Sequence, residues 1–542
     1  MSSPHISRQE WRRVSLYAVV LISLTVLPYL IAWVGQGSDW RFSGSLFGAE
    51  DGNAYLGKMR LGARGIWDFY LFYSPEKHDS VSLLYLPYII PGQVVGLFMS
   101  EDNPAMVGAL IAVFHTLRVI FNFVLILTTY RFIAIFLRAP STRFLALIFA
   151  TIGGGLGWLV VLTGHLPPEF YIPEGFSWLV LLGLPHIALA RVALLGGFIA
   201  LFKSLSLQKW QAWSKWALLA GLCWLVVGLS VTFYFVLIDA LLGAWGLVVW
   251  ARTRRFPFQL ALRCAVAVGV ALPFLAYFLI SFNNNPAFAQ WSKQNLLASP
   301  NPLQYVFAYL ILGVLAWIGG RWAWQRSHSN ELRPLLLISW VLIVPILVYL
   351  PINVQRRLAE GVLIPLAILA AAGLKLWTGL HLPKWHRARL AVVVVTSLSS
   401  LFFLIGVFFS AFNHDTPVFE PVSQLAAFQW LDKQAPNETV VLGAMETGNA
   451  LPVYTNLRPF LGHGPETIYS KRREREVSQF FRDEMTPDQR KALYRSVGIR
   501  YIFYSPAERE LAHAENDTSP SWAADGRLIY DEAGYQIYEV LP

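Results

Sequence analysis

The chain has 542 residues, 55% of them hydrophobic and only 14% charged, and so few charges cannot cover a soluble protein, in which about a quarter of residues are charged. The net charge of +10 does not indicate nucleic-acid binding, because the basic residues fall mostly in short clusters between apolar runs and form no basic face with interleaved aromatic residues. Cys223 and Cys264 both lie within apolar runs, which excludes a disulfide framework and a cysteine metal site.

Runs of about 20 apolar residues predict an α-helical integral membrane protein. The first run, Val14 to Val34, is too long for a signal-peptide core and is expected to remain as the first of about eleven transmembrane helices. Val81 to Met99 is short and broken by two prolines, so we expect a re-entrant or interfacial segment there. The ten further spans are expected near 105–128, 144–163, 186–203, 216–232, 234–250, 258–281, 303–320, 335–350, 361–377 and 390–411.

The distribution of basic residues predicts how the chain is oriented. Arg8, Arg12 and Arg13 precede the first helix, which places the N-terminus in the cytoplasm of a multi-pass cell-membrane protein. Eleven spans then put most basic clusters inside and the C-terminus outside. Arg356 and Arg357 break the rule, because they lie in a loop that this count places outside. Either the count is wrong by one helix or these arginines bind a ligand.

Composition divides the chain into two predicted domains. Residues 1–412 form the transmembrane domain, with a first outside loop at 35–104, and residues 413–542 form a small soluble α/β extracytoplasmic domain. In that second domain, strand-like runs are expected at 439–443 and 499–504, a charged helical stretch at 472–495 and a terminal hairpin at 528–540.

Two adjacent carboxylates, Glu50 and Asp51, stand just beyond the first helix. They could deprotonate an acceptor hydroxyl or hold a divalent cation, Mg²⁺ or Mn²⁺. The alternative is an Asp-Gly turn beside a solvated glutamate. A loop of about 70 residues in a tightly looped protein indicates a function of its own. The same loop holds His78 and the aromatic residues of 67–73, which are typical of a membrane-interface belt.

Other polar residues stand out against the apolar background. Glu169 and Glu174, in a second outside loop, are expected to be solvated, with a place near the acceptor as the alternative. His186, at the start of a helix, could contact phosphate or a sugar hydroxyl, or could be satisfied by a backbone carbonyl. Asp239 lies within an apolar run, where a carboxylate serves a proton relay or stands near the membrane surface.

The acidic pair after the first helix, the long first loop and Gln355-Arg356-Arg357 in a late outside loop together resemble the GT-C superfamily of membrane glycosyltransferases. Protein O-mannosyltransferases, lipid A aminoarabinose transferases and oligosaccharyltransferases belong to it. The run from Gly448 to Thr467 looks like the appended domain of bacterial members. The resemblance implies an acidic motif and surface helices in the first outside loop, and an arginine or lysine on the phosphate of a polyprenyl-phosphate sugar. No WWDYG-type signature occurs, which argues against en bloc transfer to asparagine sequons.

The predicted function is therefore transfer of a sugar from a polyprenyl-phosphate donor to an acceptor hydroxyl outside the cytoplasm. Such a reaction needs a carboxylate base, Asp51 or Glu50, and a cation on the departing phosphate, Arg356 with Arg357. One base suffices for an inverting displacement. The predicted partners are the donor, a lipid, glycan or protein acceptor, and membrane lipids, with no nucleic acid. The residues expected near the acceptor are His78, Glu169, Glu174 and His186.

Three other functions stay open at this point. A secondary transporter should show inverted repeats with broken helices, and the sequence shows no repeat. A lipid-linked glycan ligase or polymerase would share the outside loop and arginines but use a pyrophosphate-linked oligosaccharide. A non-catalytic assembly or sensor protein would leave the loop carboxylates merely solvated.

Overall fold

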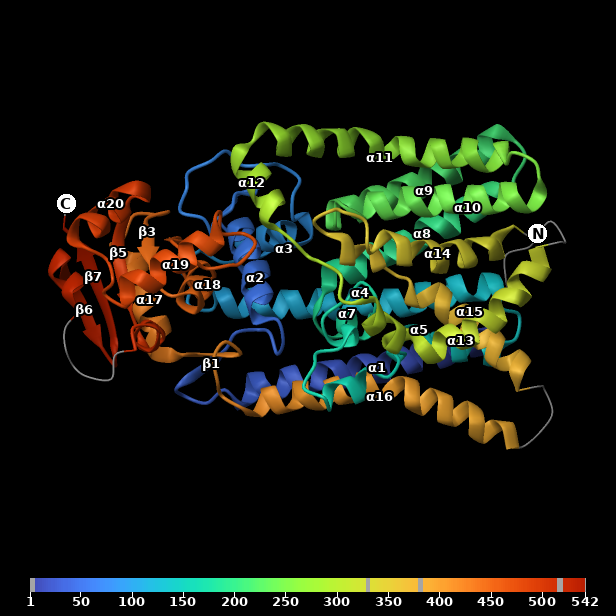
Figure 1. The fold of residues 1–542 in the computed structure, drawn as a ribbon, viewed down its shortest axis with the longest axis horizontal. Coiled ribbons are helices and arrows are strands. Elements are labelled where there is room, and N and C mark those ends of the chain that lie inside the picture. The colour runs from blue at the N-terminus through green and yellow to red at the C-terminus, as the bar shows by residue number, and fades with distance from the viewer. Residues whose placement is uncertain (1–4, 328–331, 379–383, 514–519, 542) are drawn as a thin grey trace. The chain divides into compact units, whose positions relative to one another are not determined.

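The computed structural model describes residues 5–327, 332–378, 384–513 and 520–541 (Figure 1). Its packing divides the chain into two compact units. The first unit holds Met1–Leu27, His115–Leu279 and Leu297–Gly406, and the second holds Pro28–Phe114, Ile280–Leu296 and Val407–Pro542. The second unit thus joins the loop of residues 35–104 to the C-terminal residues, and the domain boundary at residue 412 stays a prediction.

Within the described ranges, ten helical segments are long and apolar enough to cross a membrane. They are α1 (Arg8–Gly35), α4 (Met106–Phe136), α5 with α6 (Pro140–Ile152, Gly157–Val161), α8 (Pro185–Leu205), α9 (Trp210–Ser230), α10 (Tyr234–Thr253), α11 (Phe258–Asn284), α13 (Pro302–Arg326), η3 with α15 (Gln355–Ala359, Leu363–Trp377) and α16 (Lys384–Phe412). The one remaining expected span, 335–350, matches α14 (Arg333–Leu347), which has only 15 residues. The predicted class, a helical membrane protein with many spans, is confirmed.

The centre of the first unit is α15, which is almost wholly buried. It crosses α13 at two glycines. A Cβ at Gly319 would collide with the carbonyl oxygen of Leu369, and a Cβ at Gly373 would collide with that of Leu315. Small residues let the two backbones approach this closely, as is common where membrane helices pack.

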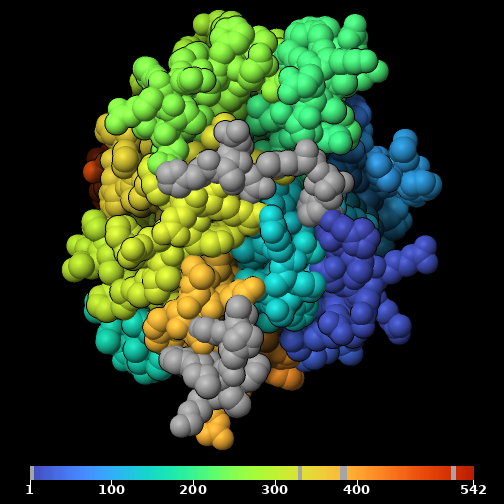
Figure 2. Space-filling view, turned by 90° about the vertical axis from the view of Figure 1, so that its right-hand side faces the viewer, coloured from blue at the N-terminus to red at the C-terminus, as the bar shows by residue number. Residues whose placement is uncertain are grey.

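The N-terminal turns of α1 are held to the start of α5 by an ion pair. The Arg143 Nη1 atom lies 2.8 Å from the Glu10 Oε1 atom, which also accepts a hydrogen bond from the Tyr130 hydroxyl at 2.9 Å. Figure 2 looks onto this end of the helices, where the dark-blue N-terminal segment lies beside the cyan segment around residue 143.

The loop of residues 35–104 belongs to the second unit. Strand β1 (Trp40–Phe42) pairs antiparallel with β2 (Phe419–Pro421), which ties the loop to the chain after α16. Helix α2 (Ala49–Ala63) packs on α3 (Leu86–Gly96), where a Cβ at Gly92 would collide with the carbonyl oxygen of Met59. The segment expected to be re-entrant or interfacial contains α3, whose 11 residues are too few to span a bilayer. Helix α12 (Pro286–Gln294) completes this part.

The C-terminal residues form a five-stranded mixed sheet in the order β4-β3-β5-β7-β6. Its strands are β3 (Val440–Leu442), β4 (Arg458–Pro459), β5 (Ile499–Tyr504), β6 (Gly526–Glu532) and β7 (Tyr535–Val540). Both strand-like runs and the terminal hairpin are thereby confirmed. The helices here are α17 (Val422–Gln434), α18 (Met445–Tyr454), α19 (Ser470–Phe481), α20 (Pro487–Val497) and α21 (Pro506–Leu511), with η4 (Ser521–Asp525).

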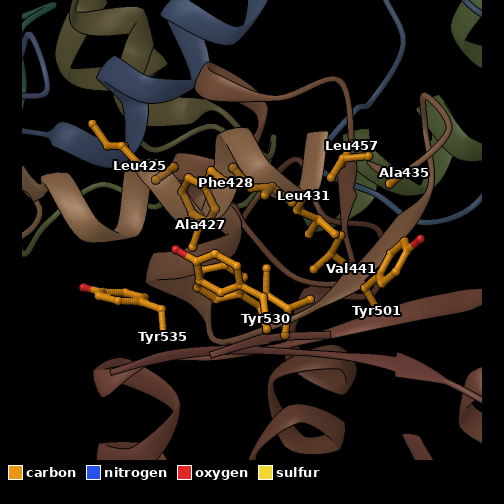
Figure 3. Close-up of a cluster of buried hydrophobic side chains, with 14 residues drawn as sticks. Leu425, Ala427, Phe428, Leu431, Ala435, Val441, Leu457, Tyr501, Tyr530 and Tyr535 are labelled. Carbon is orange, nitrogen blue, oxygen red and sulfur yellow. The ribbon is translucent and has the colours of Figure 1, made fainter. Parts of the chain in front are cut away.

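One face of this sheet is covered by α17. Figure 3 shows Phe428 and Leu431 of α17 in one cluster of buried side chains with Val441 and Tyr501 of the sheet. The charged helical stretch expected at 472–495 consists of two helices, α19 and α20. The break has a local cause, since the Thr486 side chain caps the second helix in a reciprocal capping box and a proline follows it.

Candidate functional site

Glu50 and Asp51 lie in the first turn of α2, after Gly48 in the left-handed conformation. Carboxylates are favoured there because the amino end of a helix carries partial positive charge. Both side chains are exposed, and that of Asp51 is 64% accessible. The alternative of an Asp-Gly turn is wrong, because Gly52 is helical. A glycine is needed at position 52 for another reason, since a Cβ there would collide with the side chain of Ser45.

A segment of the C-terminal sheet region, Gly462–Thr467, contacts both carboxylates. The backbone N–H of Gly464 donates to the Glu50 Oε1 atom at 2.8 Å, and the His463 Nε2 atom lies 3.5 Å from the Asp51 Oδ1 atom. Asn449 of α18 donates to the Glu50 carbonyl oxygen at 3.3 Å and to that of Gly462 at 2.9 Å. The acidic pair of the first loop and this segment therefore form one cluster within the second unit.

The charges around His463 change its titration. Burial by itself would lower the pKa of this imidazole, but the neighbouring carboxylates of Asp51, Glu466 and Glu50 more than offset burial and raise its pKa above the usual value. A histidine with a raised pKa beside an exposed carboxylate marks a candidate functional site on physical grounds.

His78, in the same loop, is half-buried. Its Nδ1 atom lies 3.1 Å from the Asp79 carbonyl oxygen, and its ring meets the edge of Phe288 at 5.8 Å between centroids. Burial lowers the pKa of His78, which keeps this imidazole neutral near pH 7. Its placement near an acceptor stays a prediction.

In the first unit, Arg356 and Arg357 lie on η3, a short 3₁₀ helix. The Arg357 Nε atom is 3.7 Å from the Glu174 Oε1 atom, and its guanidinium stands over the ring of Phe233 at 5.2 Å. Arg356 stands over the ring of Tyr171 at 5.5 Å. The Arg357 side chain is 34% exposed, so it keeps surface with which to meet an anion while one carboxylate and one ring hold it.

The expectation that Glu169 and Glu174 are solvated is wrong, because both are buried. The Glu169 Oε1 atom accepts hydrogen bonds from the backbone N–H groups of Gly155 at 3.2 Å and Gly157 at 2.9 Å. A buried carboxylate needs such partners. Glu174 faces Arg357 instead. Nearness of either glutamate to an acceptor stays a prediction.

His186 stands in the first turn of α8 and is half-buried, so the expectation of a histidine at a helix start is met. Asp239 lies in the second turn of α10 and is exposed on the protein surface. Its role, as a proton relay or as a residue near the membrane surface, stays a prediction.

The turn that carries the two arginines is anchored by a buried ion pair that the sequence reasoning missed. Arg191 of α8 makes a two-pronged contact with Glu360, at 2.5 Å from Nε to Oε1 and 3.0 Å from Nη2 to Oε2. Tyr234 donates to the same carboxylate at 3.0 Å. The Arg191 guanidinium also donates to the Glu174 carbonyl oxygen at 3.1 Å. The pair thus holds the backbone at Glu174 and the backbone just after Arg357, the two residues that contact each other.

We expect Glu360→Ala to lower the free energy of unfolding by about 3–5 kcal/mol, because it leaves the Arg191 guanidinium buried without its carboxylate. Thermal unfolding of the purified protein in detergent measures the loss. Arg472→Ala is the control, since it removes only the exposed partner of Glu476, whose Oε1 atom lies 2.8 Å from the Arg472 Nε atom, and should cost about 1 kcal/mol or less. Equal, small shifts for both variants would contradict a structural role for Glu360.

Across residues 5–327, 332–378, 384–513 and 520–541, no group of three or more His, Cys, Asp or Glu side chains is placed to hold a metal ion. The acidic pair supplies two carboxylates, one of which already accepts the Gly464 N–H group.

Solved structures with a similar fold include the Archaeoglobus fulgidus oligosaccharyltransferase. Its complex with Zn and sulfate matches with a TM-score of 0.55 at 14% identity, covering 96% of this chain and 72% of that chain. AglB from the same organism, in complex with an inhibitory peptide and a dolichol-phosphate, matches with a TM-score of 0.54 at 13% identity, covering 89% and 69%. The chain has the GT-C fold. The fold that the resemblance implied is therefore confirmed.

Another similar structure is ArnT from Cupriavidus metallidurans bound to undecaprenyl phosphate, at 14% identity over 96% of this chain and 98% of that chain. Its TM-score is 0.49. Neither a protein-family model nor a curated protein matches the sequence.

Proposed function

We propose that this protein is a glycosyltransferase that moves a sugar from a polyprenyl-phosphate donor to an acceptor hydroxyl on the extracytoplasmic face. The observation that carries the proposal is the exposed acidic pair on the first turn of α2 in a chain with the GT-C fold. The structure of AglB with dolichol-phosphate supports the class of donor, because that neighbour binds a polyprenyl phosphate.

The proposed reaction is a single displacement. The acceptor oxygen attacks the anomeric carbon, the bond from that carbon to the phosphate oxygen breaks, and polyprenyl phosphate leaves. Asp51 takes the proton of the hydroxyl, and Arg357 with Arg356 stabilises the negative charge on the departing phosphate. One displacement inverts the anomeric configuration. A planar guanidinium suits this role because it offers a phosphate two parallel donors.

Glu50 and Asp51 are the proposed ligands of any divalent cation that binds. A structure of the Archaeoglobus oligosaccharyltransferase contains Zn and sulfate, but here two carboxylates offer fewer ligands than a hard cation requires. No step is therefore assigned to a metal.

The proposal is tested by donor turnover. Membranes containing the full chain are incubated with undecaprenyl phosphates that carry radiolabelled glucose, mannose, galactose or aminoarabinose, and the label is followed out of the lipid fraction. We expect at least one donor to lose its sugar faster than in membranes without the protein. Unchanged donors throughout the panel, with the protein correctly inserted, would contradict the proposed class of donor.

The reaction also fixes a topology, because the acidic pair must face away from the cytoplasm. With the N-terminus inside and α14 counted with the ten long spans, the C-terminus lies outside. We expect alkaline phosphatase fused after Pro542 to be active and a fluorescent protein that matures only in the cytoplasm to stay dark. The opposite pattern would overturn the span count and the side of the reaction.

A further inference from the structure

The carboxylates of α2 are contacted by a segment that the proposed chemistry does not use. Gly462–Thr467 lies between β4 and α19, and its residues 463 and 464 contact the carboxyl groups of Asp51 and Glu50. The two groups differ in exposure. The Asp51 side chain is 64% exposed, whereas that of His463 is 5% exposed. The histidine therefore contacts Asp51 from the buried side, while most of the Asp51 side chain is exposed.

Hydrogen bonding fixes which nitrogen of His463 faces Asp51. The backbone N–H of Glu466 donates to the Nδ1 atom at 3.3 Å, so in the neutral ring the hydrogen resides on Nε2. That Nε2–H group is the one 3.5 Å from the Asp51 Oδ1 atom. This distance is long for a hydrogen bond, and contacts of this kind commonly tighten only when the reactants are bound.

The ring of His463 is held from its face and from its backbone. It stacks on the buried ring of Tyr73 at 5.3 Å between centroids and 28° between planes. The backbone N–H of His463 donates to the Thr467 Oγ1 atom at 3.1 Å, and that hydroxyl donates to the Tyr73 carbonyl oxygen at 2.9 Å. The imidazole thus has little freedom to turn away from α2.

A buried ion pair fastens the same segment to α2. The Lys58 Nζ atom lies 2.7 Å from the Glu466 Oε1 atom, with side-chain exposures of 1% and 6%. The ammonium also stands over the ring of Tyr85 at 4.3 Å and near that of Phe69 at 5.5 Å. Because Lys58 lies two turns after Asp51 on one helix, the pair sets the register of the segment against the acidic turn.

We propose that His463 is a positioning residue for Asp51, and that the segment Gly462–Thr467 of the C-terminal region completes the catalytic turn of α2. This inference rests on the proposed function, in which Asp51 is the base. The Nε2–H group orients the carboxylate of Asp51, which receives the proton of the acceptor. The N–H group of Gly464 holds the neighbouring Glu50 in place. The two carboxylates therefore differ in role, because Glu50 is fixed and Asp51 acts as the base.

The test compares His463→Ala with His463→Gln in the donor-turnover assay on the full chain. Glutamine carries an amide N–H at a reach close to that of Nε2, whereas alanine carries none. We expect His463→Ala to lower kcat about 10–100-fold, as for other groups that orient a functional side chain, with the KM for donor little changed. His463→Gln should recover most of the lost kcat. Unchanged kcat in the alanine variant would overturn the inference, as would equal losses in both variants.

A second comparison protects the test against a folding defect at His463. Gly464→Ala keeps the backbone N–H, and its Cβ would lie 3.7 Å from the Glu50 Oε1 atom, which is an ordinary contact. Gly464→Pro removes that N–H. We expect Gly464→Pro to lower kcat more than Gly464→Ala, and equal kcat in the two would count against the segment. Normal turnover in both Asp51→Asn and Glu50→Gln would count against the proposed function itself, whereas an inactive Asp51→Asn beside a normal His463→Ala would reject only the role of His463.

Discussion

Asp51→Asn should lower donor turnover about 10²–10⁴-fold while the protein still inserts and binds donor, because the amide keeps the shape of the side chain but cannot accept a proton. Asp51 is preferred over Glu50 as the base because its carboxylate is backed by His463 and is 64% exposed, whereas Glu50 Oε1 already accepts the Gly464 N–H group at 2.8 Å. Initial rates with a labelled undecaprenyl-phosphate sugar, at saturating donor, measure the change.

Glu50→Gln is the matched control for the assignment of the base. Glutamine still accepts the Gly464 N–H group through its carbonyl oxygen, so we expect a smaller loss than in Asp51→Asn. A larger loss in Glu50→Gln would reverse the two roles. Near-normal transfer in both variants would show that the pair only begins a helix, and the proposal of an enzyme would lose its main support.

The second large effect concerns Arg357. Arg357→Ala should weaken binding of undecaprenyl phosphate by about 2–5 kcal/mol, the cost of losing a semi-buried charged contact. Arg357→Lys should lose much less, because it keeps the charge but not the planar fork. Titration of the purified protein with undecaprenyl phosphate, followed by intrinsic fluorescence, gives the dissociation constants.

Glu174 provides the control for this experiment, since Arg357→Ala also leaves a buried carboxylate without its cation, whose Nε atom is 3.7 Å away. Adding Glu174→Gln to Arg357→Ala removes that unpaired charge. If the double variant binds the lipid as tightly as the unchanged protein, the loss in the single variant came from Glu174 and Arg357 is not the phosphate ligand. Kinetics separate the two proposed roles, because Arg357 variants should raise the KM for donor and Asp51 variants should lower kcat.

The apolar runs predicted the membrane class and nearly all spans because a helix in hydrocarbon must satisfy its backbone within itself. The exception is α14, which is shorter than the other spans because it contains only 15 residues. The strands at β3 and β5 were predictable for a similar reason, because short apolar runs bounded by polar residues are typical of buried strands. The helical stretch expected at 472–495 is present, but its division into two helices at Thr486 was not predicted, because the continuous charged pattern hides the capping box.

The site was predictable only in part, because its residues come from distant parts of the sequence. Glu50 and Gly464 are 414 positions apart, and no local spacing connects them. Glu169 and Glu174 were expected to be solvated because they lie in a loop, but a loop carboxylate is buried when backbone N–H groups or an arginine face it. Arg191 carried a usable signal, since a charge within an apolar helix normally has a partner, but only the fold identifies Glu360 as that partner.

The most direct test of the account is a structure of the full chain determined with undecaprenyl phosphate bound. The account predicts the phosphate at the guanidinium of Arg357, at hydrogen-bonding distances of about 3 Å, with the turn held by the Arg191–Glu360 pair unchanged. A phosphate bound elsewhere, with Arg357 still facing Glu174, would contradict the proposed donor site.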